Sequence, residues 1–193
     1  MSDLNSILPT NGLPKSQLNP FRVLGIDLGT TNCTVAEIVQ EQDSPLQYLE
    51  PECLEIQQPT LEGTQYTNIL LPSILAIYQG KLYIGEGAKR LRARCGDKKS
   101  KLINEKSIFW EEKNYMGVEK TMHKAPQGYQ HAREISGHIL RYLYNSALEE
   151  NDLPVQKTVI TVPASFQLAQ RQHTLKACEL AGIDISSGDM LDE

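Results

Sequence analysis

A short segment near the N-terminus combines the residue types that hold phosphate and Mg²⁺. Residues 25–31 read Gly-Ile-Asp-Leu-Gly-Thr-Thr. Asp27 could hold Mg²⁺, directly or through water, because one or two carboxylates usually bind this ion beside phosphates. Gly29 lacks a Cβ, so backbone N–H groups could approach an anion there, and Thr30 and Thr31 add hydroxyl groups. The segment predicts a phosphate-holding hairpin; the alternative is an ordinary β-turn with a capping aspartate.

Strands must position this turn, and the flanking sequence predicts them. Residues 21–27 form a short apolar run, and residues 33–39 are rich in β-branched side chains. This order is typical of a strand, a tight turn and a second strand. We also expect strands over residues 53–57, 73–78 and 81–84, with Gln79-Gly80 as the turn of a hairpin between the last two.

The second half of the chain predicts helices around a strand. Apolar residues recur at helical spacing within residues 131–150, from Ile135 to Leu148. Further helices are expected over residues 86–95 and 165–181, and strands over 158–162 and 189–191. Residues 97–130 are polar and weakly periodic, so no element is predicted there. The order indicates an α/β fold, with one sheet covered by helices and a second segment inserted into it.

Composition excludes several classes of protein. The chain has 193 residues, of which 40% are hydrophobic and 22% charged, as in ordinary globular proteins. Its net charge of −5 disfavours bulk attraction to nucleic acid or to an anionic membrane. No apolar window is long enough to span a membrane, and no signal peptide is recognised. We therefore expect a cytoplasmic protein, with a flexible tail over residues 1–20.

The cysteines and histidines do not predict a metal site. The four cysteines are far apart in sequence, which indicates reduced thiols that fill space in the core; they are Cys33, Cys53, Cys95 and Cys178. His131 and His138 lie two turns apart on one expected helix, but no third ligand stands at a fitting spacing.

Several separated motifs occur in the order of one known family. They are residues 26–32, 71–73, 84–89 and 159–166, continued by 170–172 and 181–183. Together they resemble the ATPase domain of the DnaK-type 70-kilodalton heat-shock chaperones, within the actin-like superfamily. The resemblance implies a ribonuclease-H-like core with a mixed sheet flanked by helices, formed by residues 21–55 and 126–193. Residues 56–125 would form an inserted α+β subdomain.

The resemblance also implies roles for individual residues. Asp27 matches the family's carboxylate near hydrated Mg²⁺, and Glu193 the glutamate that orients the attacking water. Lys89 matches the lysine that reaches the γ-phosphate, although its neighbouring basic residues are also typical of a solvated helix face. The phosphate-loop positions are Gly29, Thr30, Thr31 and Asn32, and the positions of an allosteric relay are Pro163 and Arg171.

The implied activity is that of an ATP-dependent chaperone of the stress response. Its cofactors would be ATP or ADP and Mg²⁺, with K⁺ as a further candidate. Unfolded polypeptides would bind a C-terminal domain that lies, like the second ATPase lobe, beyond this chain. A J-domain cochaperone and a nucleotide-exchange factor are candidate partners; nucleic acid and membranes are not expected. The isolated lobe is expected to hydrolyse ATP poorly.

Two other functions stay open at this point. A sugar kinase of the same superfamily also uses an Asp-x-Gly-Thr-Thr turn, although residues 162–166 and 170–172 speak against it. A non-catalytic interaction module is the other alternative. Residues 95–116 do not show the family's usual pattern, and Asp192 stands where the family usually has asparagine. These departures indicate a divergent member.

Overall fold

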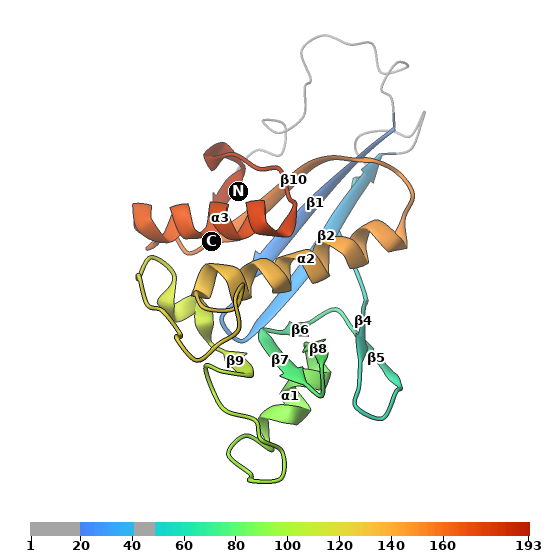
Figure 1. The fold of residues 1–193 in the computed structure, drawn as a ribbon. Coiled ribbons are helices and arrows are strands. Elements are labelled where there is room, and N and C mark those ends of the chain that lie inside the picture. Colours follow the sequence, from blue (N-terminus) through green and yellow to red (C-terminus); the bar gives the residue numbers. More distant parts are fainter. Residues whose placement is uncertain (1–19, 41–48) are drawn as a thin grey trace, which may run out of the picture.

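A computed structural model describes residues 20–40 and 49–193 (Figure 1). The tail expected over residues 1–20 lies outside the described residues, apart from Pro20. The described elements form a mixed α/β structure, as the sequence predicts. No helix in the described part of the chain is long and apolar enough to cross a membrane.

The main sheet is built around β1 (Phe21–Leu28). β1 pairs antiparallel with β2 (Asn32–Gln40) on one side and parallel with β10 (Val155–Val162) on the other. The strand order is β11-β10-β1-β2-β3, with β6 also paired to β2. The remaining strands of this sheet are β3 (Glu52–Cys53), β6 (Leu71–Pro72) and β11 (Met190–Asp192). The sheet is therefore mixed, with three neighbouring parallel strands: β1, β10 and β11.

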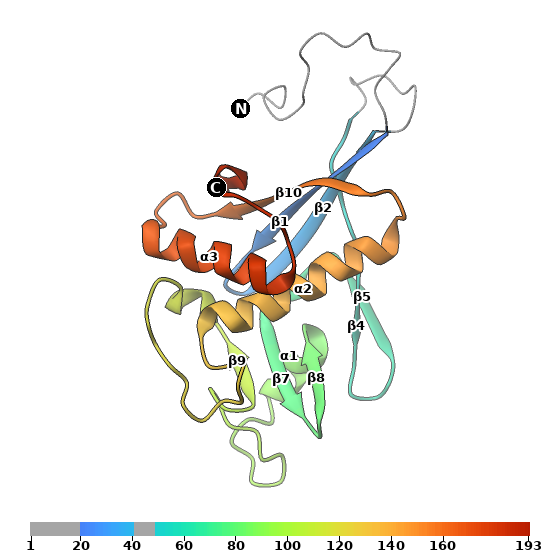
Figure 2. The same cartoon turned by 45° about the horizontal axis from the view of Figure 1, so that its top comes forward.

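Two helices pack against this sheet. They are α2 (Ala132–Glu150) and α3 (Leu168–Ala181), which lie side by side in Figures 1 and 2. The helices approach closely at Gly137, where an added Cβ would lie 3.0 Å from Leu180 Cβ. Alternate residues of β1 face the core, and α2 buries Ile135, Ile139 and Leu143 in the same hydrophobic cluster. The sequence predicts both patterns: alternate buried residues along β1 and buried residues at helical spacing along α2.

A buried arginine ties the first two strands to the end of α2. Arg22 is fully buried, and its Nε lies 2.5 Å from Glu37 Oε2. Its Nη1 donates to the carbonyl oxygen of Asn151 at 2.8 Å, and its Nη2 donates to that of Ala147 at 2.5 Å. These carbonyls lie at the C-terminal end of α2, where the helix leaves them without intrahelical partners.

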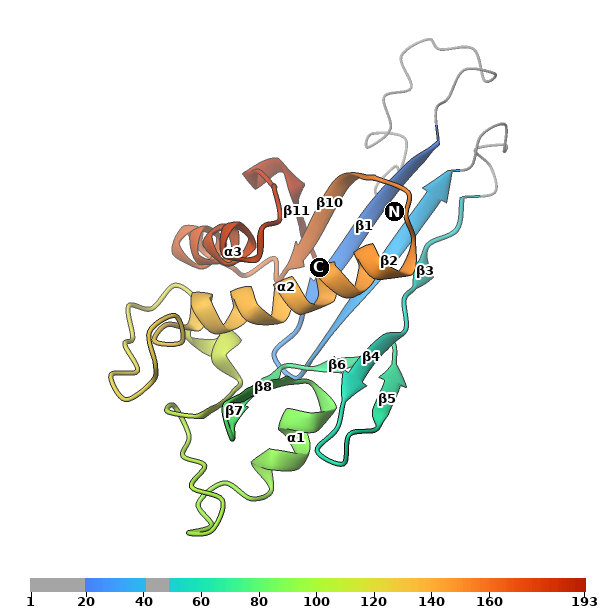
Figure 3. The same cartoon turned by 45° about the vertical axis from the view of Figure 1, so that its right-hand side comes forward.

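The inserted segment forms a smaller structure, seen below the main sheet in Figure 3. Its hydrophobic cluster includes Ile74, Leu91, Leu102 and Ile108. Its elements are β4 (Ile56–Pro59), β5 (Gln65–Asn68), β7 (Ile74–Tyr78), β8 (Lys81–Ile84), α1 (Glu86–Arg92) and β9 (Ile108–Trp110). Within the described ranges there are also short 3₁₀ helices, η4 (Glu112–Tyr115) and η5 (Ser187–Asp189).

Several element boundaries differ from the sequence prediction. The strand expected over residues 53–57 is divided between β3 and β4, which belong to different sheets. The β4–β5 hairpin was not predicted, because β5 is largely exposed and polar. α3 begins at Leu168 rather than at residue 165, after a turn in which the Phe166 N–H donates to the Pro163 carbonyl at 2.8 Å. α1 ends at Arg92 rather than at residue 95.

Candidate functional site

The carboxyl ends of three parallel strands meet at one edge of the main sheet. Asp27 of β1 pairs with Thr161 of β10, which in turn pairs with Leu191 of β11. The Thr161 hydroxyl donates to Asp27 Oδ1 at 3.0 Å. Glu193 follows Leu191 by two residues, so the alternation of side chains along a strand places Glu193 on the same face of the sheet as Leu191. Asp27 and Glu193 therefore lie at the same sheet edge, about 10 Å apart across two strand spacings and about 7 Å apart along the strand direction.

The turn between β1 and β2 lies at this same edge and requires a glycine. A Cβ added at Gly29 would lie 2.0 Å from the Asn32 carbonyl oxygen, far inside any tolerable contact. No side chain therefore fits there without moving the turn. Thr31 is exposed and Thr30 half-buried. The turn thus presents backbone and hydroxyl groups next to Asp27.

A lysine lies at this edge, but it comes from residues 97–130, for which the sequence predicts no element. Lys113 lies in η4, and its Nζ is 4.0 Å from Glu193 Oε1. The same Nζ lies 5.5 Å from the centre of the Phe166 ring, and only 11% of the Lys113 side chain is exposed. Lys113 is therefore a largely buried cation held between the end of β11 and the loop after β10.

Cys33 lies at the start of β2, at the base of the hairpin, and its thiol is buried. Burial raises the pKa of Cys33 to about 11. Among the smaller influences on this pKa, the charge of Asp27 raises it and that of Lys113 lowers it. Asp27 thus lies at the hairpin, and Lys113 contacts Glu193 at the end of β11 on the same sheet edge.

Lys89 has a different environment. It lies in α1, where its Nζ is 3.5 Å from Glu86 Oε2, and 60% of its side chain is exposed. Within the described ranges, Lys89 forms no ion pair with Asp27 or Glu193. Sequence reasoning missed Lys113 because residues 97–130 have no clear periodicity. The available signal was the apolar run at 108–110, which forms β9 and leads directly to η4.

Pro163 and Arg171 are connected through the loop after β10. Arg171 Nε donates to the Phe166 carbonyl at 3.2 Å, and the Phe166 N–H donates to the Pro163 carbonyl. Arg171 also forms an ion pair with Asp192, next to Glu193. The aspartate at position 192 thus fixes the end of β11 to α3.

The oxygen atoms around Asp27 fit a cation that keeps most of its water ligands better than a cation bound only by protein groups. Thr161 occupies Asp27 Oδ1 and leaves Oδ2 without a hydrogen bond among the described residues. The described ranges contain no group of three or more histidine, cysteine, aspartate or glutamate side chains suited to a metal. A cation beside Asp27 would therefore complete its shell with water and phosphate oxygens, as Mg²⁺ does. His131 and His138 each face a backbone carbonyl instead, those of Lys120 and Gly128.

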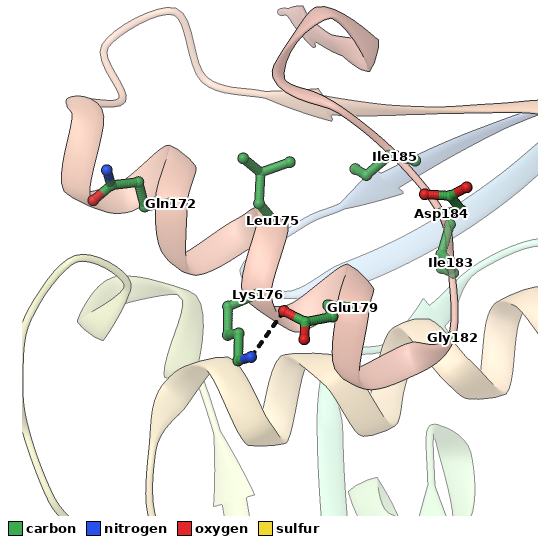
Figure 4. A pocket seen from close by; sticks show the side chains of 8 residues that line it. All are labelled: Gln172, Leu175, Lys176, Glu179, Gly182, Ile183, Asp184 and Ile185. Atoms are coloured by element: carbon green, nitrogen blue, oxygen red, sulfur yellow. Dashed lines mark hydrogen bonds and ion pairs between the residues drawn. The ribbon is translucent and has the colours of Figure 1, made fainter.

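A separate groove lies on the outer side of α3 (Figure 4). Its volume is about 510 Å³, and it is lined by α3 and the segment that follows it, including Leu175 and Ile183. An ion pair of 2.8 Å joins Lys176 and Glu179 beside it. None of the residues that line this groove belongs to the site at the strand ends, which contains Asp27, Gly29 and Glu193.

Comparisons with known proteins agree with the motif order. The model of the family described as Hsp70 protein matches residues 23–187. The chain is similar to the chaperone protein DnaK of Metamycoplasma hominis, with 36% identity over 163 residues. The DnaK proteins of Mycoplasmopsis agalactiae and Mesomycoplasma hyopneumoniae show 33% and 32% identity. In all three, the match covers 84% of this chain and 23% of the relative, so the chain spans about a quarter of their length.

Proposed function

Because the chain belongs to the Hsp70 family, we propose that it is one lobe of the ATPase domain of an ATP-dependent chaperone. Residues 21–55 and 126–193 would form its ribonuclease-H-like core, of the actin-like type, and residues 56–125 the inserted subdomain. The observation that carries the proposal is the grouping of Asp27, the Gly29 turn and Glu193 at one sheet edge. Ligands of α/β sheets commonly bind at the carboxyl ends of parallel strands.

The hairpin would hold the phosphates of ATP or ADP. The backbone around Gly29 can approach an anion closely, and Thr30, Thr31 and Asn32 supply further polar groups. Asp27 would hold Mg²⁺ through its water molecules, because Thr161 engages one of its oxygens and fixes the other. Bound Mg·ATP supplies the phosphoanhydride bond that is cleaved. K⁺ is a further candidate ion at the same edge.

Glu193 and Lys113 would act in hydrolysis, a role supported by their contact at the strand ends. Glu193 would orient the attacking water as a hydrogen-bond acceptor at the end of β11. Lys113 would place a positive charge where negative charge moves in the transition state. The resemblance assigns this cationic role to Lys89, and that assignment stays a prediction. Lys113 is a second candidate for this role, because it is largely buried and its Nζ lies 4.0 Å from Glu193 Oε1.

Pro163 and Arg171 would report the state of the nucleotide site. Arg171 contacts both the loop after Pro163 and the end of β11 that carries Glu193. A shift of Glu193 on hydrolysis would therefore pull on α3 through Asp192 and Arg171. This contact is a physical basis for the relay that the resemblance implies.

The activity of the whole protein is a further part of the proposal. Since the chain spans about a quarter of its DnaK relatives, the second lobe and a peptide-binding domain would belong to a longer parent protein. That protein would bind and release unfolded polypeptides in the cytoplasm under stress. A J-domain cochaperone and a nucleotide-exchange factor would be its partners.

An NMR titration of the ¹⁵N-labelled 193-residue chain tests nucleotide binding. Mg·ATP is expected to shift the amide signals of residues 29–32 with millimolar affinity, because only phosphate contacts are available in one lobe. Mg·pyrophosphate should shift the same signals, and adenosine should not. The proposal is wrong if millimolar Mg·ATP leaves these signals unchanged, or if adenosine moves them as much as Mg·ATP does.

A further inference from the structure

A serine of the inserted segment contacts both ends of the hairpin turn. Ser73 follows β6, and only 8% of it is exposed. Its Oγ donates to the Gly29 carbonyl at 2.7 Å, and its backbone N–H donates to the Thr31 carbonyl at 2.9 Å. One residue that lies more than forty positions away in sequence therefore holds two carbonyl groups of the turn.

Cys33 completes this arrangement. Its Sγ lies 3.1 Å from Ser73 Oγ. The Ser73 hydroxyl has one hydrogen, which the Gly29 carbonyl requires because a carbonyl can only accept. The Cys33 thiol also lies 3.7 Å from the Gly29 carbonyl oxygen, so its hydrogen is within reach of both Ser73 Oγ and that carbonyl. Burial keeps this thiol protonated at neutral pH, since its pKa is raised to about 11. Cys33 and Ser73 thus contact each other and both contact the Gly29 carbonyl, of which the Ser73 contact at 2.7 Å is the shorter.

This anchoring decides which side of the turn is available to an anion. In a planar trans peptide, the C=O and the following N–H point in opposite directions. Because the Gly29 carbonyl points toward Ser73, the Thr30 N–H points away from the inserted segment. The second bond, from the Ser73 N–H to the Thr31 carbonyl, keeps the turn from rotating. An amide fixed in advance binds an anion without a further cost of ordering.

We propose that Ser73 is a positioning residue of the phosphate-binding hairpin, and that through it the inserted segment controls how firmly the hairpin holds phosphate. The inference rests on the proposed nucleotide binding of this lobe. Ser73 itself touches no phosphate; it acts through the Gly29 and Thr31 carbonyls. A displacement of the inserted segment would disturb both hydrogen bonds from Ser73 and so move the turn. Among the described residues, no other side chain of this segment donates to the Gly29 or Thr31 carbonyl.

The test compares Ser73→Ala with Ser136→Ala in the 193-residue chain. Ser136 is also a buried serine, but it lies in α2 and its Oγ contacts Met116 Sδ at 3.8 Å. The first readout is hydrogen exchange of the amide at residue 73, which donates to Thr31, measured relative to amides within α2. Loss of one buried hydrogen bond is expected to speed this exchange about fivefold in Ser73→Ala. The α2 reference separates local loosening from general destabilisation.

The second readout is the NMR titration with Mg·ATP. Ser73→Ala is expected to weaken binding at residues 29–32 about fivefold, while Ser136→Ala keeps the wild-type affinity. Equal affinity and equal exchange in both variants, with binding retained by the wild type, would overturn the role of Ser73 alone. If the wild-type chain binds no Mg·ATP, the proposed function fails and the inference fails with it. Faster exchange without weaker binding would also overturn it, since the turn would then hold phosphate without Ser73.

Discussion

Lys113 Nζ lies 4.0 Å from Glu193 Oε1, although the lysine belongs to the inserted segment and the glutamate follows β11. The contact joins a buried cation to the carboxylate expected to act on the attacking water. We expect Lys113→Ala to lower single-turnover ATP hydrolysis at least about 100-fold in a longer protein that includes both lobes, because a fixed charge at the transition state is lost. Rapid-quench measurement of phosphate release checks this.

The matched variant is Lys89→Ala, which removes an exposed lysine paired with Glu86. If Lys113 alone supplies the charge at the transition state, Lys89→Ala should change single-turnover hydrolysis by less than about twofold. A large loss in Lys89→Ala with normal turnover in Lys113→Ala would show that the assignment from the motif order is right and that the assignment from the contact is wrong.

Gly29 and Gly25 form a second matched pair, both in or next to β1. A Cβ at Gly29 would lie 2.0 Å from the Asn32 carbonyl oxygen, whereas a Cβ at Gly25 would lie 3.8 Å from Val159 Cγ2, an ordinary contact. Gly29→Ala is therefore expected to abolish the Mg·ATP shifts at the hairpin, and Gly25→Ala to preserve them. The titration described above measures both. Normal binding by Gly29→Ala would show that the turn does not need this close approach.

The affinity of the isolated lobe is a third prediction. The adenosine contacts are expected to lie in the second lobe, so the 193-residue chain should bind Mg·ATP only weakly. Isothermal titration calorimetry should detect no binding of micromolar affinity. A micromolar dissociation constant would mean that this lobe contains a complete nucleotide site of its own.

The buried carboxyl group of Glu112 should make the free energy of unfolding depend on pH. The residue is only 5% exposed, its Oε2 has no hydrogen bond within the described residues, and burial raises its pKa to about 7. The folded protein thus keeps the carboxyl protonated at pH values where the unfolded chain ionises it. This contribution to stability is fully present below about pH 4.5 and is lost as the pH rises through 7. Between pH 6 and 8 the free energy of unfolding should fall by about 1 kcal/mol.

Urea unfolding at pH 6 and pH 8 measures this difference. Glu112→Gln should remove it, because the amide does not titrate, while the exposed neighbour Glu111 provides a control as Glu111→Gln. An unchanged pH dependence in Glu112→Gln would assign the effect to other groups.

Arg22 provides a prediction about the fold itself. Arg22→Ala would leave the largely buried Glu37 without its ion-pair partner, and the carbonyls of Ala147 and Asn151 without the donors from Arg22. We expect a loss of about 3–5 kcal/mol in the free energy of unfolding by urea. Arg133→Ala, which breaks a pair of 3.3 Å with the largely exposed Glu119, should cost less than about 1 kcal/mol. Equal losses in the two variants would contradict a structural role for the buried pair.

The sequence predicted the elements whose side chains alternate between core and solvent. β1, β2, α2 and α3 follow from apolar spacing, and the Asp27–Gly29 turn follows from its residue types. The sequence could not predict the contact of Lys113 with Glu193, because that contact depends on how η4 packs against distant strand ends. The anchoring of the turn by Ser73 was equally hidden, since neither residue type nor spacing relates position 73 to position 29.

The pairing of β1 with β10 has a consequence for synthesis of the protein. Asp27 and its partner Thr161 are 134 positions apart, so on the ribosome the β1–β2 hairpin emerges long before β10. Until then, one edge of β1 has no native neighbour and can pair with other nascent chains. The main sheet therefore cannot be completed until residues 155–162 have been synthesised, and until then a member of a chaperone family itself exposes a strand edge.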